Sequence, residues 1–190
     1  GGCQEARTVE KTWPSSCGKR GVTLLTEMTC SLFRFLSDGV DRRTDERGYL
    51  EILYERDEVV LKRSFSKRGV FRGMHWQRHP HDQTKLIRVI SGRILDFVVD
   101  PESAGRDLEY REFTPADGWV EISSHLAHGF YALEDTDFEY LCHGAYNEAA
   151  ESTYSIVDFL RNDIGLAEIV LSAKDSAAPP LKVFRKLGVR

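Results

Sequence analysis

The chain has 190 residues, of which 41% are hydrophobic and 29% charged, and its formal net charge is −4. These values are ordinary for a globular protein of one domain, and scattered basic residues on an acidic chain argue against a nucleic-acid partner. No apolar run reaches the roughly 18 residues that a membrane-spanning helix needs, so we also expect no membrane partner.

The N-terminal residues are polar and weakly patterned. We therefore expect residues 1–27 to form a poorly ordered extension and residues 28–190 to form one domain with a C-terminal tail. No continuous apolar segment of a secretory signal is present near the start. The four cysteines, Cys3, Cys17, Cys30 and Cys142, have no CxxC spacing. They are typical of free thiols in a reducing compartment, which predicts a cytoplasmic protein.

From residue 31 onwards the pattern is one of short strands separated by turn residues. Strands are expected at residues 31–36, 48–54, 58–63, 69–77, 108–113, 119–122, 128–133, 138–143 and 153–159. Residues 84–100 predict a hairpin, because two apolar alternations flank Ser91-Gly92-Arg93 and Gly92 tolerates a positive φ. The strands begin about every 8–12 residues, which favours an all-β sandwich or barrel. Helical turns are expected only near 160–169 and in the tail.

The histidines suggest which kind of barrel this is. Five of the six fall in two groups, which are His75, His79 and His81, and then His125 and His128. A metal-binding cupin, a small double-stranded β-helix (jelly-roll) barrel, carries a His-x-His pair, then a Glu, then a later His. Here the Glu position holds Lys85, whose ammonium repels a divalent metal and has no lone pair to donate. A metal-free site is therefore favoured, and a metal-dependent cupin built on His79, His81 and His128 is the alternative.

A longer set of motifs surrounds these histidines. It comprises Asp45-Glu46-Arg47-Gly48, Ser64-x-Ser66, Arg72-Gly73-x-His75-x-Gln77, Gln83-x-Lys85-Leu86, Asp96, Ala127-His128-Gly129-Phe130, Tyr140, Tyr146 with Glu151, Asp158, and Leu171-Ser172-Ala173-Lys174-Asp175. Together they resemble the signature of dTDP-4-dehydrorhamnose 3,5-epimerases, a cupin family of deoxysugar and polysaccharide biosynthesis. The resemblance covers about residues 45–181. It implies a cupin barrel with a short C-terminal helical segment.

Epimerisation next to a ketone needs a base, a stabiliser of the enolate oxygen, and an acid on the opposite ring face. His75 suits the base, because imidazole titrates near neutral pH. Asp158 would accept the other ring N–H and fix its tautomer. Lys85 suits the enolate as a compact positive charge, and Tyr140 suits the acid. The resemblance implies the same catalytic set, with no metal and no cofactor.

Five further residues are expected to bind the substrate: Arg72, Arg47, Gln77, His128 and Lys62. The two arginines suit a diphosphate, because a guanidinium forks onto phosphate oxygens, and His128 is given an orienting role. Arg72 and His75 lie three residues apart, so a regular strand would send them to opposite faces. We therefore expect a bend or bulge at Gly73.

The match to the family departs at the residues before Ser64-x-Ser66. Where the resemblance implies a Gln and an Asn that read the nucleotide base, this chain has Val60 and Lys62. The prediction is therefore an epimerase that acts at C3, C5 or both on a nucleoside-diphosphate-linked 4-keto-6-deoxysugar. A non-catalytic sugar-binding cupin is a further alternative. The resemblance also implies a homodimer in which Arg47 acts across the interface.

Overall fold

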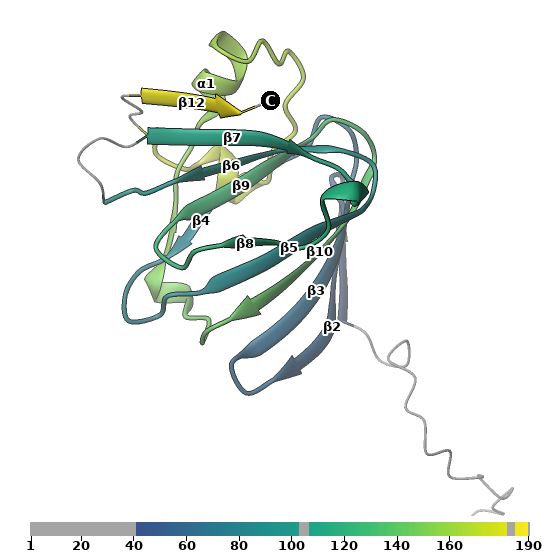
Figure 1. The fold of residues 1–190 in the computed structure, drawn as a ribbon, viewed down its shortest axis with the longest axis vertical. Helices are drawn as coiled ribbons and strands as arrows, with labels where there is room; N and C mark the ends of the chain where they lie inside the picture. Colours follow the sequence, from purple (N-terminus) through teal and green to yellow (C-terminus); the bar gives the residue numbers. More distant parts are fainter. Residues whose placement is uncertain (1–40, 103–106, 182–184, 190) are drawn as a thin grey trace, which may run out of the picture. The chain divides into compact units, whose positions relative to one another are not determined.

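Two six-stranded sheets make up the part of the chain that the computed structural model describes, residues 41–102, 107–181 and 185–189 (Figure 1). The first has the order β1 (Asp41–Asp45), β2 (Gly48–Arg56), β3 (Val59–Ser66), β10 (Thr136–His143), β5 (Thr84–Ser91), β8 (Val120–Ile122). The second has the order β11 (Glu151–Thr153), β4 (Phe71–Gln77), β9 (Ala127–Ala132), β6 (Ile94–Val99), β7 (Asp107–Phe113), β12 (Arg185–Val189).

Neighbouring strands pair antiparallel except β7 and β12, which are parallel. Helical segments are short: the 3₁₀ turns η1 (Pro115–Asp117) and η2 (Glu148–Ala150), and the helices α1 (Val157–Asn162) and α2 (Ala173–Ser176). The all-β prediction with a short C-terminal helical segment is confirmed. No helix among the described residues is long and apolar enough to cross a bilayer. The predicted extension 1–27 and strand 31–36 lie outside the described residues.

The predicted hairpin at residues 84–100 is wrong, although both of its strands exist. β5 pairs with β10 and β8 in the first sheet, whereas β6 pairs with β9 and β7 in the second. Gly92 has the expected positive φ of 82°, but it carries the chain from one sheet to the other. A Cβ at this position would lie 2.4 Å from the carbonyl oxygen of Asp135. The turn is thus packed against the turn before β10, and the two strands find other partners.

The predicted strand at residues 153–159 is correct only at its start. β11 ends at Thr153, and the helix α1 begins at Val157. Ile156, Phe159 and Leu160 are buried together, and their spacing of three and four residues suits one face of a helix. The burial of this apolar face therefore favours a helix, although the alternation of apolar and polar residues in the sequence predicted a strand.

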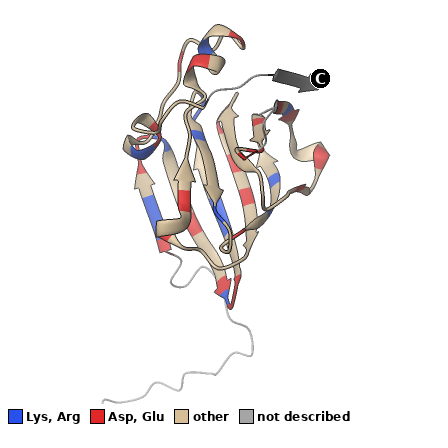
Figure 2. Cartoon of the chain, turned by 90° about the vertical axis from the view of Figure 1, so that its left-hand side faces the viewer, with Lys and Arg blue, Asp and Glu red and all other residues tan. Residues whose placement is uncertain are grey.

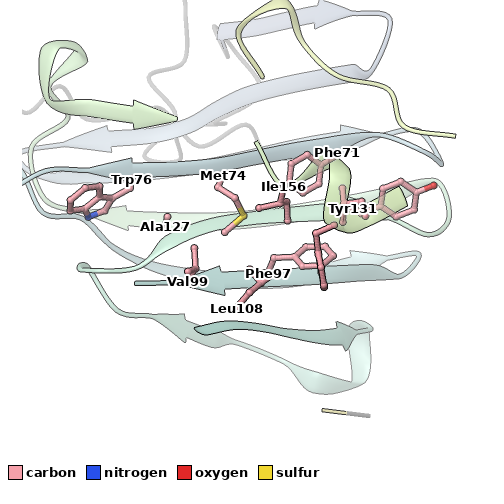
Figure 3. Packing of buried hydrophobic residues seen from close by; sticks show 11 residues of the cluster. Phe71, Met74, Trp76, Phe97, Val99, Leu108, Ala127, Tyr131 and Ile156 are labelled. Carbon is pink, nitrogen blue, oxygen red and sulfur yellow. The ribbon is translucent and has the colours of Figure 1, made fainter. Parts of the chain in front are cut away.

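The strands β4, β6 and β9 of the second sheet have buried side chains on both faces, and successive residues alternate between these faces. Along β6, Ile94 belongs to a cluster between the sheets with Phe130 and Phe138. Phe97 and Val99 belong to another cluster, on the opposite face. There the side chains of β4, β6, β7 and β9 pack together with Ile156 and with Phe159 of α1 (Figure 3). Phe71 and Trp76 of β4 also lie in this second cluster.

Candidate active site

A cavity of about 730 Å³ lies between the inner faces of the two sheets. The first sheet contributes residues of β1, β2, β3, β5 and β10 to its wall, and the second contributes residues of β4 and β9. Residues of β11 and α2 close one side. A cavity of this size falls in the range of small-molecule sites, about 300–1,000 Å³.

Positive side chains dominate the wall of this cavity. They are Arg43, Arg47, Lys62, Arg72, Lys85 and Lys174, against the acidic residues Glu55, Glu151 and Asp175. In Figure 2, Lys and Arg lie within several strands and not only in turns. A hollow lined by cations attracts an anionic ligand and raises its local concentration.

The strand β4 bends so that Arg72 and His75 both reach the cavity. Its pairing with β9 shifts register between these two residues, which confirms the predicted irregularity at Gly73. Gly73 has a φ of 130°, and a Cβ there would lie 2.5 Å from the Cα of Gly129. The close approach of β4 and β9 therefore requires glycine at this position.

The imidazole of His75 lies between two carboxylates. Its Nδ1 is 2.9 Å from Oε1 of Glu151, and its Nε2 is 3.0 Å from Oδ1 of Asp175. The hydroxyl of Tyr146 and the ammonium of Lys174 each lie 2.7 Å from the other oxygen of Glu151. Each ring nitrogen therefore faces an acceptor.

Burial by itself lowers the pKa of His75, but the contacts with Asp175 and Glu151 outweigh it and raise the pKa above 6.5. The hydrogen bond to His75 correspondingly lowers the pKa of Glu151. Burial opposes ionisation of Asp175, yet the contact with His75 holds the pKa of Asp175 below its usual value. The two carboxylates therefore favour the protonated form of the ring, while burial opposes it.

The predicted pairing of His75 with Asp158 is wrong. Asp158 is exposed in the first turn of α1, whereas Glu151 is hydrogen-bonded to Nδ1 of the ring and Asp175 lies within ion-pair distance of Nε2. The sequence motifs contained both of these residues, but nothing in their spacing assigned them a role. Asp175 is held by its own helix, because Ser172 Oγ lies 2.7 Å from its Oδ2.

Lys85 and Tyr140 reach the same cavity as His75. Lys85 Nζ donates to the backbone oxygen of His75 over 3.4 Å, and burial lowers the pKa of Lys85. Tyr140 lies on β10, where it packs on the ring of Phe138 with centroids 5.7 Å apart. Burial raises the pKa of Tyr140 well above 10, so its hydroxyl stays protonated across the physiological range.

The two arginines are anchored at the cavity wall. Arg72 donates from Nε to Ser66 Oγ over 2.9 Å and from Nη2 to the oxygen of Phe65 over 3.3 Å. Arg47 pairs with Asp45 over 2.6 Å and lies 3.7 Å from Oδ2 of Asp175. Arg47 lines the cavity of its own chain, and its action across a dimer interface stays a prediction.

The other predicted binding residues also line the cavity. The Lys62 ammonium lies 5.6 Å from the ring centroid of Tyr140. Gln77 is buried and accepts from the backbone N–H of Asn147 over 3.1 Å. His128 pairs through Nε2 with Asp96 over 2.7 Å, and both residues are buried. Asp96 thus occupies Nε2 of His128, and the orienting role of His128 stays a prediction.

The residues of the alternative metal site do not come together. His79 is exposed and pairs with Asp82 over 2.7 Å, while His81 contacts Asn147. Only His128 of that set lines the cavity. Within the described ranges, no group of three or more His, Cys, Asp or Glu side chains is arranged to hold a metal ion.

The family model for dTDP-4-dehydrorhamnose 3,5-epimerase matches residues 39–183. The chain belongs to this family. An epimerase of that name from Mycobacterium tuberculosis is 34% identical over 144 residues, 66% of this chain and 67% of the relative. A dTDP-4-dehydro-6-deoxyglucose 3-epimerase from Streptomyces bikiniensis is 31% identical over 134 residues, 65% of this chain and 67% of the relative.

A solved structure agrees with this membership of the 3,5-epimerase family. The crystal structure of dTDP-4-dehydrorhamnose 3,5-epimerase from Sulfolobus tokodaii superposes with a TM-score of 0.58 and 31% sequence identity, covering 75% of this chain and 89% of that chain. The cupin-type fold and the epimerase activity predicted from the motifs are therefore confirmed at the level of the family.

Proposed function

We propose that the chain inverts C3, C5 or both carbons of a nucleoside-diphosphate-linked 4-keto-6-deoxysugar, by removing and returning a proton without a metal or cofactor. The observation that carries this proposal is the position of His75, which lies in a cation-lined cavity of nucleotide-sugar size against the buried carboxylate of Asp175. The names of the relatives include a 3,5-epimerase and a 3-epimerase, so the proposal covers both carbons.

The base in this mechanism is His75 with Asp175 as its orienting partner. Asp175 is the better fixed of the two carboxylates, since its side chain is 2% exposed and Ser172 holds it. Glu151 has two other partners, Tyr146 and Lys174, that keep it in place when it releases Nδ1. We infer that substrate binding breaks the contact between Glu151 and His75 and leaves the Nδ1 proton on Glu151. The freed lone pair of Nδ1 then takes the proton next to the ketone.

Lys85 and Tyr140 complete the chemistry. When the base removes the proton, negative charge develops on the ketone oxygen, and the Lys85 ammonium stabilises that enolate in a buried setting. Tyr140 then gives its phenolic proton to the opposite face of the carbon, which inverts the centre. Its raised pKa keeps that proton available. Arg72, Arg47 and Lys62 supply positive charge for the diphosphate.

The assembly is proposed to be a cytoplasmic homodimer. β1 is an edge strand of the first sheet in the described part of the chain, and an unpaired edge favours pairing with another chain. Size-exclusion chromatography with light scattering gives the molar mass in solution, which tests the homodimer.

Solvent exchange tests the proposed activity. The protein is incubated in deuterated water with dTDP-4-keto-6-deoxyglucose, and NMR follows deuterium at C3 and C5. We expect incorporation by the native protein and none by His75→Asn. Exchange that persists in His75→Asn would remove His75 as the base, and exchange that stops with a chelator would favour the metal-dependent alternative. A native protein that binds the sugar nucleotide but exchanges nothing would be a sugar-binding cupin.

A further inference from the structure

Ser64 is a buried hydroxyl on the wall of the cavity. The residue is 1% exposed and lines the cavity, and its Oγ has no hydrogen-bond partner among the described residues. Buried polar groups in native proteins are nearly always paired, and an orphan is costly. We therefore look for the hydrogen-bond partner of this hydroxyl in the ligand that occupies the cavity.

The neighbours of Ser64 on β3 indicate what kind of ligand atom it meets. Residues two apart share a face of a strand, so Lys62, Ser64 and Ser66 point to the same side. Ser66 is already used, because its Oγ accepts from Arg72 Nε. Ser64 thus lies between the Lys62 cation and the anchored Arg72 guanidinium.

The two cations attract the negatively charged oxygens of an anionic ligand, so the hydroxyl of Ser64 between them should lie next to those oxygens. Lys62 attracts these oxygens as a point charge and Arg72 offers a planar guanidinium, whereas a hydroxyl donates a single hydrogen bond along one direction. A buried hydroxyl of this kind discriminates strongly, since a ligand without the matching acceptor leaves it unpaired.

We propose that Ser64 is a substrate-recognition residue whose hydroxyl donates a hydrogen bond to an oxygen of the bound sugar nucleotide, in the diphosphate or in the adjoining sugar. This inference rests on the proposed function for the identity of the ligand. It adds a neutral, directional donor beside the Lys62 and Arg72 cations.

Binding of ligands that do not react tests the proposal separately from catalysis. Calorimetry would compare the native protein with Ser64→Ala and Ser64→Cys, using dTDP and dTDP-glucose, which has no ketone. Ser64→Cys keeps the size of the side chain but donates weakly. We expect both variants to bind dTDP-glucose about tenfold more weakly, the change for one lost hydrogen bond. Ser91→Ala, in an exposed serine at the end of β5, is the matched control and binds normally.

Comparing the binding of dTDP with that of dTDP-glucose shows whether the acceptor oxygen is in the diphosphate or in the sugar. An equal loss with dTDP assigns the hydrogen bond to the diphosphate, and a loss confined to dTDP-glucose assigns it to the sugar. The unliganded variants are expected to unfold at the native temperature or above it, because the hydroxyl they lose is unpaired. A merely structural serine would instead lower that temperature.

Unchanged affinity for both ligands in Ser64→Ala would overturn the proposal, as would weaker binding that is matched by a loss of stability. A native protein that binds neither ligand would overturn it as well. These results are distinguishable from failure of the proposed function, which shows in the native protein as binding without exchange.

Discussion

Oδ1 of Asp175 lies 3.0 Å from Nε2 of His75, although one residue belongs to the helix α2 and the other to the strand β4. The carboxylate is almost fully enclosed, while the ring is about one third exposed toward the cavity. The contact therefore joins a fixed acceptor to an accessible imidazole, which is the arrangement that orients a histidine base.

Replacing Asp175 by Asn should reduce turnover strongly. The amide no longer compensates positive charge on the ring, and we expect kcat to fall by roughly 10²–10⁴-fold, the range for an impaired acid–base pair. Steady-state kinetics gives the value. Asp158→Asn is the matched control, since Asp158 is exposed on α1, and its kcat should be native. The reverse ranking of the two variants would restore the assignment made from sequence.

The acidic limb of the pH profile should lie above pH 6.5. In the proposed mechanism His75 is the base and must be neutral to act, and its contacts with Asp175 and Glu151 raise its pKa in the free protein. The profile of kcat/KM, which reports the free enzyme, should therefore fall as pH drops through that raised pKa. Glu151→Gln should move the limb to lower pH. A limb that does not move would show that Glu151 has no influence on the base.

The same contacts link stability to pH. Because the folded pKa of His75 is raised, its contribution to stability is complete below the unfolded value of about 6.5. That contribution is lost as pH rises through the folded pKa. Thermal unfolding of the native protein and of His75→Asn across this window should show a difference that shrinks at higher pH.

Tyr140→Phe should separate exchange from inversion. In the proposed mechanism His75 of this variant still removes a proton and returns a deuteron on the same face, but the variant lacks the phenol that protonates the opposite face. We expect deuterium in recovered substrate with no epimerised product, measured by NMR. Native amounts of epimer from this variant would mean that another group is the acid.

Lys85→Met should abolish enolate stabilisation without unfolding the protein. Removing one positioned donor in a buried site costs roughly 10²–10³ in kcat. Burial already disfavours this ammonium, as its lowered pKa indicates, so an apolar side chain of similar length should be tolerated. Kinetics and thermal unfolding together check both parts. Native turnover would remove Lys85 from the mechanism.

Gly73→Ala should destabilise the fold by roughly 3 kcal/mol or more, because it combines backbone strain with a clash. The new Cβ would lie 2.5 Å from the Cα of Gly129 on the neighbouring strand. Gly165→Ala is a matched control, since Gly165 has a φ of 83° with no atom within 4 Å of the added Cβ. Denaturant unfolding should show a smaller loss of free energy of unfolding for Gly165→Ala, because that variant has backbone strain but no clash. Equal losses would mean that the clash contributes nothing.

Local patterns predicted the strands well, because alternation and turn residues act within a few positions. They could not choose partners, which is why β5 and β6 were expected to pair although Gly92 sends them into different sheets. The bend at Gly73 was predictable, since two functional side chains three apart required it.

The site was predictable where a residue type limits the chemistry. The motifs contain few His, Lys and Tyr residues that could serve as base, cation and phenol, so His75, Lys85 and Tyr140 could be selected from the sequence. All three line the cavity. The carboxylate partner was misassigned, because acidic residues are frequent and only the packing of α2 brings Asp175 to the ring. The role of Glu151 was missed for the same reason.

The strands β6 and β9 of the second sheet have side chains packed on both faces, which limits where a substitution can change ligand preference without disturbing the core. A substitution of an apolar residue in these two strands disturbs either the inter-sheet cluster or the cluster that includes Phe159 of α1. The hairpin of β2 and β3 instead has partly exposed positions and still reaches the cavity through Leu50, Ile52, Val60 and Lys62. Substitutions at Leu50, Ile52 and Val60 should therefore alter the contacts with a ligand at less cost to the packing of the core than substitutions in β6 or β9.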